Sequence, residues 1–352
     1  MSDQLRAAVI GAGYWGPNLA RNFRTSPDWD LVAVCDLDET RARKVVGARR
    51  PVDARPSVPG LLARDAVAAV PAPPPAGTHA AITLAALDAG KHVVVEKPIA
   101  STSADARRMV DRADELGLTL MVDHTFCYTP PVLKLRELIS EGALGDIHFV
   151  DSVRINLGLV QPDVNVFWDL APHDLSILDF VLPGGLVPVG VAAQGADPIG
   201  AGQACVGYLT LPLPDGAIAH VHVNWLSPTK IRQMVVGGSK QTVVWDDLQP
   251  QQQLTVYDRG VRLGEPVPDK TTTNVSYRIG DAWSPALPAK EALGAMVAEF
   301  AAAIREGRPA RTDGRAGLRV LEVLEASSVS LARGGTVVRP KEPAPAGVEV
   351  SA

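Results

Sequence analysis

Hydrophobic and polar residues alternate in blocks along the first third of the chain. Short apolar runs, each suited to a buried strand, are separated by alanine-rich stretches with helical periodicity. In one such stretch Ser103 suits a helix N-cap and Gly117 a C-cap. Strands that alternate with helices predict a parallel sheet with helices on both faces. The apolar runs lie at 7–10, 31–35, 67–70, 92–95 and 119–122, and the helical stretches at 18–25, 80–90 and 103–117.

The pattern changes after about residue 128, where strand-like runs begin to dominate. We therefore expect an α/β chain whose second, α+β domain carries a large, mostly antiparallel sheet. The predicted domains are residues 1–127 and 128–340, and the proline-rich tail 341–352 is expected to be disordered. The later strands are predicted at 147–156, 187–194, 204–211, 217–225, 230–236, 242–245 and 254–257, and the helices at 131–141, 173–182, 289–306 and 314–331.

Composition excludes several classes of function. The 352 residues are 46% hydrophobic and 21% charged, which is ordinary for a globular protein with a substantial core. A net charge of -5 argues against a nucleic acid or a membrane surface as partner. Three scattered cysteines without a CxxC pattern suggest neither a disulfide framework nor a metal site. The N-terminus does not resemble a signal peptide and no apolar run reaches about 20 residues, so we expect a cytoplasmic protein.

A glycine motif follows the first apolar run. The segment AAVIGAGYWGPNLARNF places Gly11, Gly13 and Gly16 in a GxGxxG spacing between a strand and a helix. That context is typical of a Rossmann dinucleotide-binding turn. Gly11 would allow the tight turn, Gly13 the close approach of a pyrophosphate, and Gly16 the packing of helix on strand. Pro17 suits the first helical turn because its missing N–H has no partner there.

An acidic residue ends the second apolar run. Asp36 lies 20 residues beyond Gly16, where a carboxylate can accept hydrogen bonds from the adenosine ribose. A carboxylate at that place repels a 2′-phosphate, so NAD is favoured over NADP. Asp38 could share this role, and either acid could instead be a solvated residue after a strand.

The run VVVEKP raises the question of why a buried strand ends in two opposite charges. In a parallel sheet, ligands bind outside the carboxyl ends of the strands. Lys97 is therefore expected on the same edge as the glycine motif, with Glu96 paired to a nearby donor. Pro98 fixes the exit of the chain, and the bond before it can be cis.

A possible proton relay lies in the second domain. The segment VFWDLAPHDLSILDFVL places Asp169 and His173 four residues apart, on one face of a helix. Histidine, with an unperturbed pKa of about 6.5, can accept a proton near neutrality. On spacing alone, Asp169 could equally be an N-cap and His173 a buried structural histidine.

Several segments together resemble the Gfo/Idh/MocA oxidoreductases, which include glucose-fructose oxidoreductase and inositol dehydrogenase. The resemblance rests on GAGYWGPNLARNF, on THAAITLAALDAGKHV followed by EKP, and on DVNVFWDLAPHDLSILDF, and it extends to about residue 340. It implies a Rossmann domain, a C-terminal domain whose open sheet carries substrate, and a homodimer or homotetramer. It also implies NAD-dependent hydride transfer at a sugar hydroxyl or keto carbon, with a nucleotide-linked or amino sugar as the substrate class.

The resemblance assigns roles to individual residues. Lys97, Asp169 and His173 are the expected catalytic residues, with His173 as acid/base, Asp169 orienting it and Lys97 polarising the substrate oxygen. Independently of the resemblance, Lys230, Arg232 and Arg278 could bind a phosphate or a carboxylate, and His124, Tyr128, Arg154 and Asn156 could line the cleft; each of these could equally be a surface charge or a core contact. The expected cofactor-binding residues are Gly11, Gly13, Tyr14, Trp15, Gly16, Asp36, Pro75, His79, Glu96 and Lys97, and those expected to bind substrate are Lys97, His124, Tyr128, Arg154, Asn156, Asp169 and His173.

One segment departs from the family pattern. The sequence AAVPAPPPAGTHA stands where the family has a turn with a threonine near the cofactor. Because Pro71 cannot donate to a sheet, we expect the strand to stop near Val70. A stiff loop at 73–75 would put the affinity for the cofactor in question.

Two rival functions stay open at this point. A cyclitol dehydrogenase of the inositol type would need no diphosphate site. A non-catalytic NAD-binding or scaffold protein is supported by the altered proline loop, whereas the combination of Lys97, Asp169 and His173 argues against it.

Overall fold

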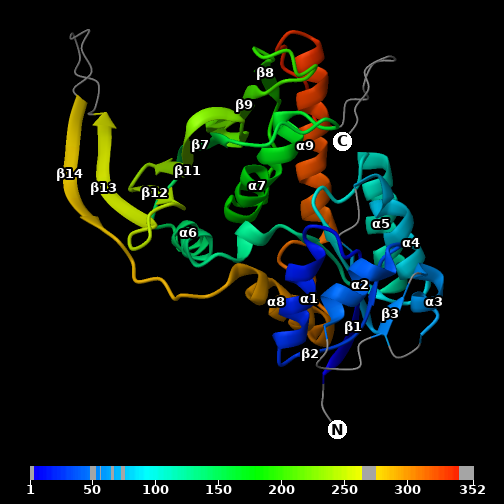
Figure 1. Cartoon of the computed structure of the whole chain (residues 1–352). Helices are drawn as coiled ribbons and strands as arrows, with labels where there is room; N and C mark the ends of the chain where they lie inside the picture. Colours follow the sequence, from blue (N-terminus) through cyan, green and yellow to red (C-terminus); the bar gives the residue numbers. More distant parts are fainter. Residues whose placement is uncertain are drawn as a thin grey trace. The chain divides into compact units, whose positions relative to one another are not determined.

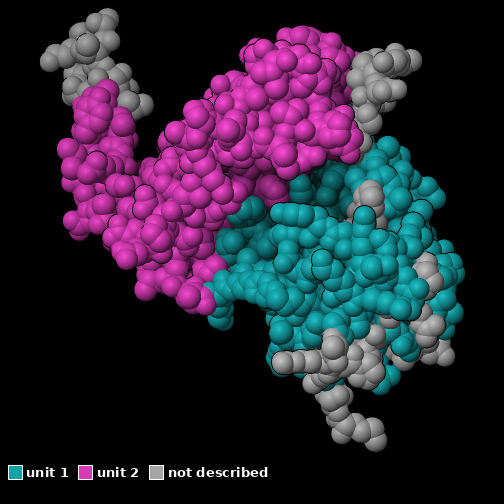
Figure 2. Space-filling view, in the orientation of Figure 1, with its two compact units in different colours: residues 1–129, 290–325, 349–352 teal, residues 130–289, 326–348 magenta. Residues whose placement is uncertain are grey.

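The computed structural model describes residues 4–47, 53–55, 57–64, 67–72, 76–263 and 275–340, which form two compact units (Figures 1 and 2). Unit 1 comprises residues 1–129 and 290–325, and unit 2 comprises residues 130–289 and 326–348. The first boundary falls close to the predicted one. The tail at 341–352 lies outside the described residues.

The domain prediction differs from the structure in one segment. Residues 290–325 were expected in the second domain but belong to unit 1. Helix α8 (Ala292–Glu306) contacts α1 (Gly16–Thr25), and Trp29 Nε1 donates a 2.9 Å hydrogen bond to Val297 O. The ring of Trp29 also lies 5.0 Å from that of Phe23 and 5.3 Å from that of Phe300. A helix late in the sequence thus completes the core beneath an early strand.

Unit 1 is built around a six-stranded parallel sheet in the order β3-β2-β1-β4-β5-β6, which confirms the predicted architecture. The strand order reverses between β1 and β4, and such switch points in parallel sheets bind ligands. The strands are β1 (Leu5–Ile10), β2 (Trp29–Cys35), β3 (Asp53–Arg55), β4 (Ala69–Ala72), β5 (His92–Glu96) and β6 (Leu120–Asp123). Beside α1 and α8, its helices are α2 (Glu39–Val46), α3 (Val58–Leu62), η1 (Ala76–Thr78), α4 (His79–Asp88), α5 (Ser103–Leu116), η2 (Thr125–Tyr128) and the first part of α9 (Gly314–Ala332).

The prediction that proline would end the fourth strand near Val70 was wrong. Strand β4 continues through Pro71 to Ala72, and these residues pair with Val94 and Val95 of β5. Among the described residues, the pairing of β4 with β1 is recorded at Ala7–Ala69, before the proline. Pro71 lies beyond the residue of β4 that pairs with β1. Its missing N–H therefore leaves that recorded pairing intact, and the strand tolerates the proline.

Helix α5 begins one residue from the predicted cap. Thr102, rather than Ser103, is the N-cap, and its Oγ1 accepts a 3.1 Å hydrogen bond from the N–H of Asp105. Gly117 is the C-cap with φ of 65°, a left-handed conformation that favours glycine. The helix therefore ends where the sequence predicted.

Unit 2 contains an eight-stranded sheet in the order β14-β13-β12-β11-β7-β10-β9-β8. The pair β7–β10 is parallel and the other neighbours are antiparallel. The sheet is therefore mostly antiparallel, which confirms the prediction. Helix α7 packs against β7, β9 and β10. The strands are β7 (Ile147–Leu157), β8 (Ala192–Ala196), β9 (Val206–Pro212), β10 (Ile218–Asn224), β11 (Leu226–Gly238), β12 (Thr242–Asp246), β13 (Leu254–Leu263) and β14 (Val275–Trp283); the other elements are α6 (Pro130–Ser140), α7 (Val166–Val181) and η3 (Pro214–Gly216).

Glycine at position 207 lets α7 lie directly on the sheet. A Cβ at Gly207 would overlap the ring of Phe167, which is 1% exposed. We predict that Gly207→Ala lowers the free energy of unfolding by about 1–3 kcal/mol, because the buried ring must move. Gly77→Ala, at an exposed position where no atom of the described residues comes within 4 Å of the new methyl group, serves as control. Equal stability of the two variants in denaturant unfolding would contradict this packing.

Candidate active site

The glycine motif forms the turn between β1 and α1. Gly11 has φ of 112°, and its N–H donates a 2.7 Å hydrogen bond to Cys35 O of the neighbouring strand. Apart from its chain neighbours, no described residue has an atom within 4 Å of a Cβ built on Gly13, so the backbone is open to a ligand there. Trp15 is the N-cap residue of α1 but makes no side-chain cap bond. The first turn of the helix therefore keeps N–H groups that can bind an anion.

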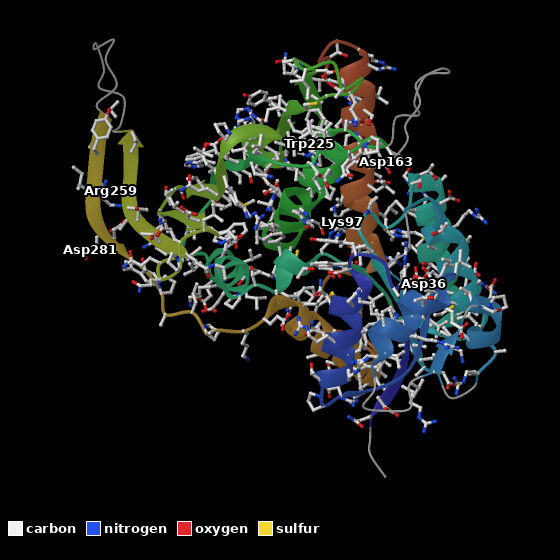
Figure 3. The ribbon with its side chains drawn as sticks, viewed as in Figure 1. Asp36, Lys97, Asp163, Trp225, Arg259 and Asp281 are labelled. Atoms are coloured by element: carbon white, nitrogen blue, oxygen red, sulfur yellow. The ribbon has the colours of Figure 1, made fainter. Side chains whose placement is uncertain are left out.

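Asp36, labelled in Figure 3, follows β2 and bonds to the backbone of this turn. Its Oδ2 accepts a 2.6 Å hydrogen bond from the N–H of Ala12, and its Oδ1 accepts one of 2.8 Å from the N–H of Asp38. Asp38 is the N-cap of α2, with Oδ1 accepting from Thr40 N at 2.9 Å. Asp38 is thus committed to the helix, while the half-buried Asp36 carboxylate faces the glycine turn. This division favours Asp36 as the ribose acceptor.

The VVVEKP segment ends β5 as predicted. The bond between Lys97 and Pro98 is cis, and His79 Nδ1 lies 2.8 Å from Pro98 O. His79 is 1% exposed, so its ring supports this turn. Glu96 is the register partner of Asp123 at the end of β6. Burial and the neighbouring Asp123 carboxylate raise the pKa of Glu96 well above its ordinary value.

Two residues after β6 were expected to line a substrate cleft. His124 is 2% exposed, and its ring nitrogens find no hydrogen-bond partner among the described residues. Burial, helped by the charge of Lys97, lowers the pKa of His124 to about 3, so the ring is neutral. Tyr128 is 1% exposed, and its hydroxyl lies 2.8 Å from Thr312 Oγ1. These contacts place Tyr128 in the core of unit 1, and its role toward substrate stays a prediction.

The pair Asp169 and His173 lies on α7, in unit 2. The helix N-cap is Asn165, whose Oδ1 accepts from the N–H groups of Phe167 and Trp168 at 3.0 and 3.2 Å. Asp169 is therefore not the cap. Its Oδ2 accepts a 2.9 Å hydrogen bond from Trp225 Nε1, which fixes the carboxylate one turn before His173. Both residues of the pair are only half-buried in a helix that is otherwise mostly buried.

A buried ion pair fastens α7 to the sheet. Arg154 of β7 donates from Nε to Asp174 Oδ2 at 2.7 Å and from Nη2 to Oδ1 at 3.0 Å. Ser152 Oγ adds a 2.9 Å bond to Asp174 Oδ1. The side chains of Arg154 and Asp174 are 3% and 2% exposed. This bidentate pair accounts for the burial of Arg154, and a substrate contact by Arg154 stays a prediction.

The other predicted residues fall in different surroundings. Asn156 is half-buried on β7, beside Gly158 and near Trp225. Arg232 and Arg278 are each paired with an aspartate, at 2.7 Å from Asp247 and Asp258 respectively. Lys230 is exposed. Tyr14 is 95% exposed in the glycine turn, and Pro75 lies outside the described residues.

Most of the chain is similar to known oxidoreductases. Residues 5–124 match the family described as "Oxidoreductase family, NAD-binding Rossmann fold", and residues 132–244 match the "GFO/IDH/MocA C-terminal domain". An uncharacterised oxidoreductase of Escherichia coli (strain K12) is 30% identical over 72% of this chain and 74% of its own length. The chain belongs to the Gfo/Idh/MocA oxidoreductase family.

Two members of this family are similar along most of their length. UDP-N-acetylglucosamine 3-dehydrogenase of Acidithiobacillus ferrooxidans is 29% identical over 90% of this chain and 94% of its own. A solved structure of that enzyme has a TM-score of 0.80 at 26% identity, covering 94% and 99% of the two chains. The protein GenD2 of gentamicin A biosynthesis, solved with NAD, has a TM-score of 0.77 at 25% identity over 96% and 97%.

The residues of the glycine turn fit the NAD that the family binds. An added Cβ would fill the open space in front of Gly13, and the first turn of α1 offers uncapped N–H groups. Asp36 supplies a carboxylate at the β2 side of the turn. Among the described residues, no group of three or more His, Cys, Asp or Glu could hold a metal ion, and none of the helices is long and apolar enough to cross a membrane.

Two contacts of the site were missed by sequence reasoning. Trp225 is buried in the core at 1% exposed, and its Nε1–H also holds the Asp169 carboxylate. Trp15 Nε1 donates to Asp123 Oδ2 at 3.2 Å, which links the glycine turn to the end of β6. These contacts span 56 and 108 residues of sequence. The acidic residue directly after the apolar run at 119–122 was the one local signal that could have indicated Asp123.

We predict that Asp36→Ala reduces the preference for NAD over NADP. The variant removes the carboxylate that would repel a 2′-phosphate, so the ratio of the NADP to the NAD dissociation constant should fall about tenfold, or ~1.4 kcal/mol. Calorimetric titration with both nucleotides measures this ratio. Asp38→Ala, which removes the α2 cap, should cost about 1 kcal/mol of stability and leave the ratio unchanged. An unaltered ratio in Asp36→Ala would refute the assignment.

Proposed function

We propose that this protein oxidises a hydroxyl group of a sugar or nucleotide-linked sugar, or reduces the corresponding keto sugar, with NAD. The observation that carries the proposal is the fixed Asp169 carboxylate on α7, held by Trp225 one turn before the half-buried His173. The similarity to a UDP-N-acetylglucosamine 3-dehydrogenase over most of both chains supports the same substrate class.

Each proposed role follows from the chemistry of the side chain. A neutral His173 imidazole can take the proton of a substrate hydroxyl, and the neighbouring Asp169 carboxylate would stabilise the imidazolium that forms. Lys97, at the end of β5, would donate hydrogen bonds to the substrate oxygen and stabilise negative charge on it. Bound NAD supplies the hydride chemistry, accepting a hydride from the alcohol carbon or, when reduced, returning one to a keto carbon.

A cyclitol substrate is the second candidate. Three basic side chains were candidates for binding a phosphate. Two of them, Arg232 and Arg278, form ion pairs with aspartates, and the third, Lys230, is exposed. A cyclitol needs no diphosphate site, so these pairings favour it over a nucleotide sugar. Turnover of a free cyclitol without any nucleotide-linked sugar being accepted would select this alternative.

We predict that Lys97→Ala and His173→Ala each lower turnover by at least ~10²–10⁴-fold while NAD still binds. Reduced-nicotinamide absorbance would be followed with NAD and a panel of nucleotide sugars, free sugars and cyclitols. His148→Ala, which removes an exposed histidine of β7, is the matched control and should keep full activity. Retained turnover in both Lys97→Ala and His173→Ala would rule out the mechanism.

We further propose that the protein is a homodimer or homotetramer that assembles through the face of the eight-stranded sheet opposite α7. On that face, apolar and aromatic side chains are exposed in neighbouring strands, among them Phe149 (37%), Tyr208 (53%) and Ile218 (38%). Monomeric proteins seldom expose a large contiguous apolar patch, and such patches commonly mark interfaces.

We expect Ile218→Asp to dissociate this assembly, because it would bury an unpaired charge in the interface. Light scattering coupled to size-exclusion chromatography reports the mass. Leu116→Asp, which changes a residue of unit 1 with similar exposure (40%), should leave the mass unchanged. A monomeric wild-type protein would contradict the proposed oligomer.

A cytoplasmic location is also part of the proposal. Cys35, Cys127 and Cys205 are all buried and none forms a disulfide. Unpaired thiols are typical of a reducing compartment.

A further inference from the structure

Two acidic side chains lie next to each other at the carboxyl ends of β5 and β6. Glu96 and Asp123 are register partners in the parallel sheet, which sets their side chains next to each other on one face of it, and each carboxyl group shifts the pKa of the other. Asp123 is 3% exposed, and Glu96 Oε2 is buried without a donor from any other described residue. Two ionised carboxylates offer acceptors only. A hydrogen bond between two such buried neighbours therefore requires one proton on the pair.

The surrounding donors show which carboxyl group carries that proton. Asp123 Oδ1 accepts a 2.5 Å hydrogen bond from Thr125 Oγ1, and Oδ2 accepts one of 3.2 Å from Trp15 Nε1. Such bonds favour the ionised form. Glu96 accepts a hydrogen bond from the backbone N–H of Lys97, but burial together with the Asp123 charge outweighs it and raises the pKa of Glu96 well above the ordinary value. Glu96 is thus the acid and Asp123 the carboxylate.

The charges around this carboxyl pair nearly balance. Lys97 follows Glu96 in the chain, and its charge lowers the pKa of both carboxyl groups. His124, after β6, is neutral because burial and Lys97 lower its pKa to about 3. With Glu96 protonated, the positive Lys97 and the negative Asp123 cancel. Loss of the shared proton gives the cluster a net negative charge.

The carboxyl pair is joined to the glycine turn on the side away from Asp36. Trp15, which bonds Asp123, is the N-cap residue of α1. Asp36 ends β2, whereas β5 and β6 lie on the other side of β1 in the sheet. A dinucleotide whose ribose is held by Asp36 therefore extends from the turn toward β5 and β6. Its oxidised nicotinamide ring carries a positive charge that the reduced ring lacks.

We propose that Glu96 and Asp123 share one proton beside Lys97, and that loss of this proton shifts the protein's preference between the two cofactor forms toward NAD over NADH. Both acids are positioning residues, since they act through the charge they place near the cofactor. The inference requires NAD to bind at the glycine turn, but it does not depend on which substrate is oxidised.

The affinities for NAD and NADH, measured by calorimetry between about pH 6 and pH 9, test this proposal. In the wild type, the ratio of the NADH to the NAD dissociation constant should rise roughly tenfold with pH, the scale of one charge interaction inside a protein. In Glu96→Gln the ratio should stay at the low-pH wild-type value, because a neutral amide donates to Asp123 as the protonated acid does. Glu115→Gln, at an exposed acid of α5, should keep the wild-type slope.

A second variant, Asp123→Asn, tests whether the pH dependence requires both carboxyl groups of the pair. In Asp123→Asn the amide can donate to Glu96, which then ionises beside Lys97, so the net charge of the cluster again stays near zero. The affinity ratio should therefore also be independent of pH. A wild-type slope that persists in Glu96→Gln would show that another group titrates, and would overturn the proposal.

Proton release provides a measurement that needs no variant. Titration of wild-type protein with NAD in two buffers of different ionisation enthalpy should show protons released near the pKa of Glu96, whereas NADH should release fewer. Equal release for both nucleotides, or a flat affinity ratio, would contradict the shared proton. Absence of binding by either nucleotide would overturn the proposal together with its premise, while leaving the substrate class to be judged by turnover.

Discussion

The parallel register of unit 1 turns the carboxyl end of every strand toward one edge of the sheet, and the chemistry of the site depends on it. Gly11 after β1, Asp36 after β2 and Lys97 after β5 reach that edge from positions far apart in sequence. The hydrogen bond from Trp15 to Asp123 ties two of these strand ends together. The register of the buried strands thus sets which residues meet at this edge, and the glycine turn adds the local backbone shape, with Gly11 at φ of 112°.

In unit 2 a buried ion pair fixes the position of the helix that carries the candidate catalytic residues. The bidentate contact of Arg154 with Asp174 fixes α7 on β7, and Asp174 directly follows His173 in the helix. Removing one partner would leave a buried charge uncompensated, which is far costlier than the pair itself. The helix therefore cannot easily rotate, and Asp169 and His173 are held on its less buried side. Trp225 then restricts the Asp169 carboxylate further.

The sequence predicted the features that depend on residues close together in the chain. The sequence indicated three such features: the GxGxxG turn, a Lys–Pro bond that can be cis, and the i, i+4 spacing of Asp169 and His173. Contacts between distant segments were not indicated, since neither the Glu96–Asp123 register nor the Trp225–Asp169 bond leaves a periodic signal. Short polar elements such as α2 and β3 were also missed. Pro71 was misjudged because the rule against proline in central strands assumes a complete ladder on both sides.

The most direct test of the central claim is the transfer of hydrogen from carbon to nicotinamide. The protein would be incubated with NAD and a mixture of carbon-deuterated sugars, nucleotide sugars and cyclitols, and the reduced nucleotide analysed by mass spectrometry. The proposed mechanism predicts NADH one mass unit heavier than normal, because the hydride comes from the alcohol carbon. Reduced nucleotide without deuterium, or none at all while NAD binds, would contradict a dehydrogenase acting on this class of substrate.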